Sequence, residues 1–462
     1  MLKHLLLATA LIAAPASAET LQDAIAAAYG SNPQIAAARA RLRQVDEGVP
    51  LASAGMRPTV DLTGDFTQEF SDRLGDRGQL WRGGAVVAQP IYQGGRVRAG
   101  ISAAEAQIAA QRAQLRATEY QVIVDTVAAY ADVLKTEAVV RLNEGQVKLL
   151  GEQLRASRDR FEVGDLTRTD VAQSEARLAA ARAGLQGAIA QRTLARQAYR
   201  RLVGNDPVDL QPLPALPATP ATEDEARNRA FELNPSMAAA RFSEKAAAEN
   251  VRAAKAGRGP SVAVNAGARY VHGTESVAGL TGFSPTLGVS AGMPLFSGGL
   301  IAAQVRQAQA AQSEALENIT QTERLVAEGT TGSYALLRTA ESLIESSKVQ
   351  ISANELAAEG VRQENQVGSR DILDVLNAEQ ELLNSRVNLV QAERDRYVAA
   401  YELFEMMGNL ETVLEGAPIG RYDAEANANR VRGKGWQEFG YDPDPRTDRS
   451  RNQAPPLVGP TQ

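Results

Sequence analysis

The sequence predicts an internally duplicated membrane protein of mixed α and β class, with four strands per chain and a coiled coil of very long helices. Three observations predict this fold. Motifs recur at offsets of 202 to 204 residues. Two pairs of segments alternate apolar and polar residues over the length of a membrane-spanning strand. Residues 91–206 and 295–417 contain no proline, as expected for uninterrupted helices.

The duplication divides the chain into two equivalent halves. Pro33 and Pro235 are 202 residues apart, and the motif Pro-(Ile/Leu)-(Tyr/Phe)-x-Gly-Gly at Pro90 recurs at Pro294 with an offset of 204. One register maintained over this distance indicates an internal repeat. We therefore expect a first repeat at 19–210 and a second at 223–415, joined by the proline-rich linker 211–222.

Each half contains a segment with the two-residue period of a β-hairpin, at about 59–92 and 261–296. In the first, Val60, Leu62 and Phe66 alternate with acidic and hydroxyl residues. We expect strands around the charged loop Ser71–Leu80, the second strand being Trp81–Ile91, and in the second half a strand that continues to Leu295. Strands of this length span a bilayer, although soluble hairpins remain the alternative.

Four strands cannot close a barrel, and lipid does not tolerate an open sheet edge. The chain must therefore share its barrel with copies of itself. Three copies give twelve strands, an even number within the known range. The polar face of the strands would then line a water-filled lumen.

Helical periodicity returns after each hairpin. Ile101, Ile108, Leu115 and Val122 recur every seven residues, which is typical of a coiled-coil seam. We expect helical hairpins at about 96–203 and 300–408, with tips at 163–166 and 367–370 where Val-Gly interrupts the helix. A helix from 96 to 161 would be roughly 100 Å long at 1.5 Å per residue.

Glycine pairs stand where each strand gives way to a helix. They are simpler to interpret as sharp turns than as phosphate-binding loops. The predicted strand-to-helix transitions are Pro90, Gly94, Gly95, Pro294, Gly298 and Gly299.

Composition argues against an enzyme. The chain has no cysteine and two histidines, and it lacks the Gly-x-Ser-x-Gly, P-loop and His-Glu-x-x-His motifs. We therefore expect no catalytic residue, no metal site and no cofactor. The formal net charge of −6 gives no basic footprint, so we expect no nucleic-acid partner.

Both ends of the sequence have special compositions. Residues 1–18 have a charged start, a short apolar core and an Ala-Ser-Ala cleavage site, which predict a signal peptide and export; a buried helix is the alternative. Residues 416–462 are polar and rich in Pro and Gly, which predicts a largely disordered tail, in which Trp436, Phe439 and Tyr441 are candidates for local docking.

The duplicated Pro-(Ile/Leu)-(Tyr/Phe)-x-Gly-Gly motif and the duplicated Val-Gly tip, each with an aspartate six residues after its glycine, resemble TolC-type outer-membrane efflux proteins over nearly all of 19–415. The resemblance implies a homotrimer, with a twelve-stranded β-barrel in the lipid of the outer membrane above a twelve-helix periplasmic tunnel. It implies a passive channel of a tripartite efflux or type I secretion system. Its partners would be a periplasmic adaptor (membrane fusion) protein and an inner-membrane pump of ABC or RND type.

The resemblance also implies roles for residues at the tips. Docking of the adaptor falls to Val163, Gly164, Asp165, Leu166, Thr167, Val367, Gly368 and Ser369. A periplasmic gate would be closed by Arg370 with Asp170 as its acceptor, while Asp374 would ring the constriction. Asn365 and Asn377 replace a tyrosine and an aspartate of the family pattern, and Asp371 is an additional carboxylate. Ordinary helix capping is the alternative for these residues.

An exported structural coiled-coil protein is the competing function. It explains the signal and the long helices, but not two amphipathic hairpins of membrane-spanning length. The cargo of the channel stays open, since drugs, metals and secreted proteins are all carried in the family that the sequence resembles.

Overall fold

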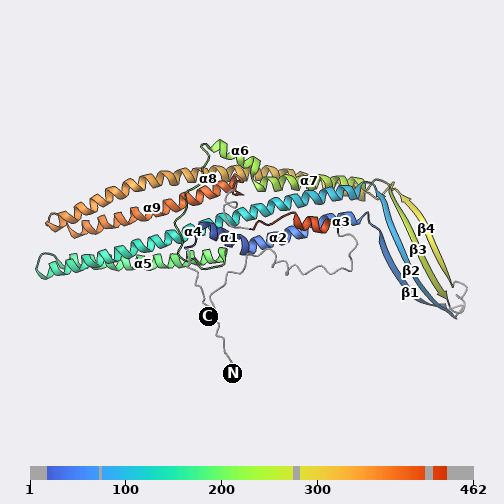
Figure 1. The fold of residues 1–462 in the computed structure, drawn as a ribbon, viewed down its shortest axis with the longest axis horizontal. Coiled ribbons are helices and arrows are strands. Elements are labelled where there is room, and N and C mark those ends of the chain that lie inside the picture. The colour runs from blue at the N-terminus through green and yellow to red at the C-terminus, as the bar shows by residue number, and fades with distance from the viewer. Residues whose placement is uncertain (1–17, 72–74, 274–280, 412–419, 434–462) are drawn as a thin grey trace, which may run out of the picture. The chain divides into compact units, whose positions relative to one another are not determined.

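A computed structural model of the chain describes residues 18–71, 75–273, 281–411 and 420–433, and the side chains of 69–78 are left aside (Figure 1). The predicted signal peptide, apart from Ala18, lies outside the described residues. So do Trp436, Phe439 and Tyr441.

The helices and strands follow the same order in both halves of the chain, except that the first half has an additional short helix, α3, before its strands (Figure 1). The first half contains α1 (Leu21–Ser31), α2 (Pro33–Asp46), α3 (Gly48–Ala54), β1 (Thr59–Ser71), β2 (Gly75–Gln93), α4 (Arg96–Glu162) and α5 (Arg168–Val203). The second half contains α6 (Glu223–Leu233), α7 (Pro235–Ala256), β3 (Ser261–Gly273), β4 (Gly282–Gly292), α8 (Leu300–Gln366) and α9 (Ile372–Met406). α4 and α8 are each 67 residues long.

The two prolines that anchor the repeat begin equivalent helices. α2 begins at Pro33 and α7 at Pro235. Proline suits the first helical position because its missing N–H has no intrahelical partner there. The Asn234 side chain accepts hydrogen bonds from the next backbone N–H groups, at 2.8 Å from Ser236 and 3.3 Å from Met237.

The four strands form one antiparallel sheet in the order β1-β2-β3-β4 (Figure 1). Three predicted strand limits were wrong. β2 ends at Gln93 and not at Ile91, because it still pairs with β3 there. β2 begins at Gly75 and not at Trp81, because its backbone continues to pair with β1 beyond the opposed residues Trp81 and Phe66. β4 ends at Gly292 and not at Leu295, because its partner strand β3 begins opposite, at Ser261, and Pro294 has no N–H to donate.

The described chain forms two compact units, each drawn from both halves. Among the described residues, the first unit contains 18–32, Tyr120–Ala226, 330–411 and Gly420, and its apolar cluster includes Leu150 and Leu154 of α4, Leu178 of α5 and Leu376 of α9. The second unit contains the sheet, and a smaller cluster there joins Ala230, Met237 and Val326.

Equivalent tyrosines of the two repeats hold the two ends of the linker in the first unit. The buried Tyr130 hydroxyl lies 2.7 Å from the Gln211 carbonyl oxygen and 2.9 Å from that of Glu19. Tyr334, its counterpart 204 residues later, donates to the Ala221 carbonyl at 3.0 Å. Burial, reinforced by the nearby Glu19 carboxylate, raises the pKa of Tyr130 to about 12, so its hydroxyl keeps the proton that it donates.

We predict that Tyr130→Phe destabilises the first unit by about 1–3 kcal/mol, because the part-buried Gln211 carbonyl loses its hydroxyl donor and the Glu19 carbonyl keeps only the Gln211 backbone N–H. The apparent melting temperature of the purified protein should fall by several degrees. Tyr334→Phe is the matched control, since its hydrogen bond is exposed and water replaces the lost partner. An equal fall in both variants would contradict this assignment.

The C-terminal segment corrects one prediction. Residues 420–433 were expected to be disordered, but they include α11 (Ala426–Arg432), which packs on α2 and α3. Four side-chain contacts hold this segment. The Tyr422 ring packs against the Arg39 guanidinium at 4.8 Å, and Asn427 forms a hydrogen bond with Asp46 at 2.8 Å. Two ion pairs complete the set, Glu425 with Arg112 at 3.1 Å and Arg432 with Glu105 at 3.4 Å. The polar composition hid these partners, because they come from distant parts of the sequence.

Candidate functional site

One face of the sheet is apolar and uncovered by the described chain. Residues directly opposite in an antiparallel pair point to the same side, so the strand register assigns every side chain to a face. Nine large apolar side chains that are at least 37% exposed fall on this face: Val60, Leu62, Phe66, Trp81, Val87, Tyr270, Phe283, Leu287 and Val289. Such a continuous exposed apolar surface is suited to lipid.

Aromatic residues mark the two limits of this apolar face. Phe66, Trp81, Tyr270 and Phe283 lie near the hairpin ends of the strands, and the Phe66 and Trp81 rings are 4.6 Å apart. Exposed aromatic side chains, among them Tyr92, recur where the strands meet the helices. Tyr92 follows Trp81 by eleven positions along the chain. For a strand tilted by about 40° this corresponds to roughly 25–28 Å, the height of a membrane apolar band.

The opposite face of the sheet is polar. It carries Asp61, Thr63 and Asp65 of β1, and the Asp65 carboxylate accepts a hydrogen bond from Arg82 of β2 at 2.8 Å. On β3 and β4, the Asn265 amide donates to the Ser290 hydroxyl at 3.1 Å. A sheet with one lipid-compatible face and one hydrated face has the two surfaces of a pore wall.

Both outer edges of this sheet are open. Among the described residues, no strand pairs with the free edge of β1 or with that of β4. Unpaired backbone N–H and C=O groups cost several kcal/mol each in hydrocarbon, so these edges require strands from other chains.

The predicted strand-to-helix transitions lie where the sequence places them. Gly94, Gly95, Gly298 and Gly299 adopt positive φ angles of 63°, 86°, 60° and 86°. A Cβ atom at Gly94 would lie 2.4 Å from the Ala256 carbonyl oxygen, so only glycine fits there. Pro90 precedes a bulge at which the pairing of β2 with β3 shifts before Tyr92, and Pro294 follows the end of β4.

The first tip is a tight turn between α4 and α5. Gly164 has a φ angle of 82°, and Asp165 accepts a hydrogen bond from Arg160 at 2.7 Å. Thr167 and Asp170 form a reciprocal capping box, in which the Asp170 carboxylate accepts from the Thr167 backbone N–H at 2.8 Å. Val163 is 80% exposed at the turn, and Leu166 lies in the same turn.

The second tip repeats this turn between α8 and α9. Gly368 has a φ angle of 81°, and Val367 is 80% exposed. Arg370 contacts two carboxylates of its own tip, Glu364 at 2.9 Å and Asp374 at 3.4 Å. Asp371 is the N-cap of α9, and the Ser369 hydroxyl donates to the Glu364 carbonyl at 2.9 Å.

The structure thus brings Arg370 and Asp374 together, whereas Asp170 is engaged by Thr167 of the same chain. The predicted link between Arg370 and Asp170 is not formed inside one chain. A contact between neighbouring chains stays a prediction. Within the single chain, Asp170 and Asp371 act as helix caps, which is the alternative role considered above.

Sequence reasoning missed the polar links between the two tips. The buried Asn365 amide donates to the Arg370 carbonyl at 2.8 Å, and its oxygen accepts from Arg160 of the first tip at 3.3 Å. Asn377 accepts from Arg177 of α5 at 2.7 Å. These are the two positions where the chain departs from the family pattern. The departure from the family pattern could have indicated these contacts, because an asparagine accepts hydrogen bonds from arginine as the replaced residues would.

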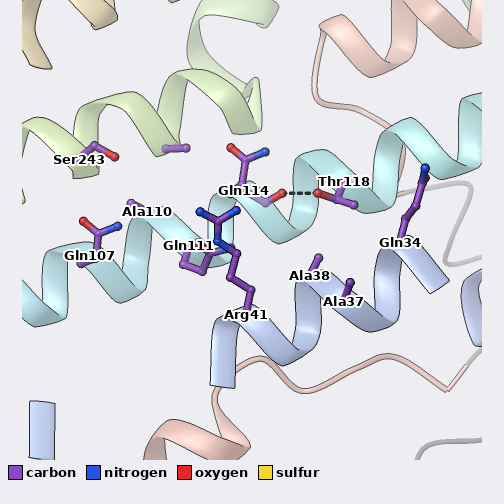
Figure 2. Close-up of a pocket in the computed structure, with 11 residues that line it drawn as sticks. Gln34, Ala37, Ala38, Arg41, Gln107, Ala110, Gln111, Gln114, Thr118 and Ser243 are labelled. Atoms are coloured by element: carbon purple, nitrogen blue, oxygen red, sulfur yellow. Dashed lines mark hydrogen bonds between the residues drawn. The ribbon is translucent and has the colours of Figure 1, made fainter. Parts of the chain in front are cut away.

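A cavity of about 530 Å³, lined by both polar and apolar side chains, lies between α2, α4 and α7 in the second unit (Figure 2). Figure 2 shows Arg41 and the amides of Gln107 and Gln114 around it, and the Thr118 hydroxyl donates to the Gln114 carbonyl at 3.0 Å. No group of three or more potential metal-ligating side chains occurs among the described residues. Within the same residues, no helix has the length and apolarity needed to span a membrane.

A one-sided apolar sheet with open edges, joined to long helical hairpins, defines a class of subunit that builds an outer-membrane channel with a helical extension. The model of the outer membrane efflux protein family matches residues 24–205 and 226–409, and the chain belongs to that family. Its members are channels of efflux and type I secretion systems, located in the outer membrane with a periplasmic helical tunnel. The function and location predicted from the sequence are therefore confirmed.

Individual relatives agree with this assignment. The chain is 32% identical to outer membrane efflux protein BepC of Brucella suis over 434 residues, covering 93% of this chain and 94% of BepC. It is 25% identical over 415 residues to outer membrane protein TolC of Vibrio cholerae, covering 85% and 91% of the two chains. The crystal structure of VceC from Vibrio cholerae has a TM-score of 0.73 at 22% identity, covering 84% of this chain and 96% of VceC. This likeness confirms the predicted fold class.

Proposed function

We propose that three copies of this chain assemble into a single passive duct through the outer membrane and the periplasm. The observation that carries the proposal is the sheet with one uncovered apolar face and two open edges. Pairing β4 of one copy with β1 of the next satisfies both edges and places the polar face inside. Three copies close a wall of twelve strands, which is wide enough to hold an aqueous channel.

The helical tips are the surface that we assign to the partners. Val163 and Val367 expose apolar side chains at two equivalent turns, and an exposed apolar side chain gains free energy when a partner covers it. We assign this surface to a periplasmic adaptor protein, together with Gly164, Asp165, Leu166, Thr167, Gly368 and Ser369. The adaptor connects the duct to an inner-membrane pump of ABC or RND type. That pump supplies the energy and the choice of cargo, and the duct itself performs no catalysis.

Three measurements on the full-length mature protein test the assembly. It should fractionate with the outer membrane, migrate as a heat-resistant trimer on a gel and conduct ions in a planar bilayer. A protein released as a soluble, stably folded monomer without detergent would contradict the proposal and favour an exported structural coiled coil.

We propose that the polar contacts at the second tip hold the duct closed. Arg370 is the central group, because it contacts Glu364 and Asp374 in its own chain and lies at the exposed end of the hairpin. Around a threefold axis Asp374 becomes a ring of three carboxylates, which attracts cations. Asp170 and Asp371 stand at the starts of α5 and α9 and complete the candidate gate.

We predict that Arg370→Ala raises the single-channel conductance severalfold, because the remaining carboxylates repel one another and separate the tips. Arg386→Ala is the matched control. It removes a comparable exposed ion pair, formed with Glu355 at 2.7 Å between the same two helices, but it does not lie at the tip. Equal conductance of the wild type and Arg370→Ala in planar bilayers would exclude Arg370 from the gate.

A further inference from the structure

The polar face of the sheet carries four charged groups among the side chains that the structure describes. Asp61 and Asp65 belong to β1, Arg82 to β2 and Arg269 to β3. Asp65 and Arg82 are directly opposite each other and form an ion pair at 2.8 Å. Their charges therefore cancel locally, and Arg269 and Asp61 are left to determine the local potential.

Arg269 has no counter-charge beside it. Its neighbours across the sheet are Gly84 on β2 and Ser284 on β4. A Cβ atom at Gly84 would lie 2.9 Å from the Ala268 carbonyl oxygen, so this position excludes a side chain. The exposed Arg269 guanidinium forms no ion pair or hydrogen bond with the residues that the structure describes.

Asp61 is too far away to neutralise Arg269. It lies two strands from Arg269 and one row of side chains nearer the helices. With strands about 4.8 Å apart and rows about 6.6 Å apart, the two Cα atoms are separated by roughly 12 Å. This distance exceeds the Debye length of about 8 Å at physiological salt. Among the described side chains of one chain, none therefore neutralises the positive charge of Arg269.

We infer that Arg269 sets a preference for anionic solutes in the part of the pore between the Asp61 row and the hairpin ends of the strands. This inference rests on the proposed trimeric duct. Three copies place three guanidinium groups, none of them ion-paired within the described residues of its own chain, at one level of the lumen, and rings of arginine favour the passage of anions. Arg269 is thus a specificity-determining residue of the barrel, separate from the acidic groups at the tips.

A cysteine introduced beside Arg269 measures the local potential. The chain contains no cysteine, so Ser284→Cys gives a single thiol directly opposite Arg269. Its labelling rates with an anionic and with a cationic methanethiosulfonate reagent are compared in the assembled trimer at low salt. Adding Arg269→Gln should lower the ratio of anionic to cationic rates about 3–10-fold, and about 1 M salt should remove the difference.

Two control variants make the outcomes distinct. Asn265→Gln alters a neutral residue on the same face of β3, and it should leave the ratio unchanged. Val289→Cys places the thiol on the apolar face, where neither charged reagent should react. A ratio that does not respond to Arg269→Gln overturns the inference while the pore stands. Failure of both reagents to label Ser284→Cys, combined with rapid labelling of Val289→Cys, overturns the assignment of the faces and the proposed duct with it.

Discussion

Leu287→Arg should remove most of the assembled trimer from the outer membrane. Leu287 is 81% exposed in the middle of β4, opposite Ala266 on the apolar face of the sheet. An arginine at the midplane of a membrane barrel costs about 2–4 kcal/mol, and the trimer incurs this cost in each subunit. We expect at least a tenfold loss of heat-resistant trimer in the outer-membrane fraction, as quantified on gels.

Thr286→Arg is the matched control, because the adjacent residue faces the polar side of the same strand. The same charge there meets water, so the trimer should form at close to the wild-type level. Normal assembly of Leu287→Arg, or an equal loss in both variants, would show that the apolar face does not contact lipid.

The double substitution Val163→Asp and Val367→Asp should abolish binding of the adaptor while leaving the trimer intact. Both valines are 80% exposed at the tips, so their replacement removes no core packing. Covering a valine on binding contributes about 1.5–3 kcal/mol, and a buried unpaired carboxylate adds a further penalty. Co-purification of the adaptor with the channel should therefore fall more than tenfold.

The pair Val163→Thr and Val367→Thr provides the graded control, since threonine keeps the shape of valine and carries no charge. It should reduce co-purification less than the aspartate pair does. Undiminished adaptor binding by the aspartate variant, with trimer present, would remove the tips from the proposed interface.

The sequence predicted the fold well where one simple period governs a segment. The strict alternation from Val60 to Phe66 identified β1, and the glycine pairs at Gly94 and Gly298 placed the turns, because only glycine adopts positive φ at low cost. The start of β2 could not be predicted in this way. A charged, glycine-containing stretch resembles a loop until the pairing partner on β1 is known.

The polar contacts of the tips were predictable in position but not in pairing. The Val-Gly motifs located both turns. The acceptors of Arg370 depend on the three-dimensional geometry of the tip, which residue spacing does not predict. Asn365 illustrates the difficulty. It departs from the family pattern, and it bridges the two tips because the fold brings Arg160 of α4 next to α8. The ordered structure of residues 420–433 was not predicted either, because its contacts also come from distant parts of the sequence.

The pairing of β2 with β3 joins the two repeats within one polypeptide, as β4 and the next copy's β1 would join them between polypeptides. In the proposed cylinder, half of the seams between hairpins are therefore intramolecular and half are intermolecular. Six unlinked half-length subunits would close a ring of the same circumference, but they would need five association steps instead of two. In the proposed trimer, the two repeats joined in one chain thus avoid three association steps, and each copy of the hairpin can differ in sequence from the other.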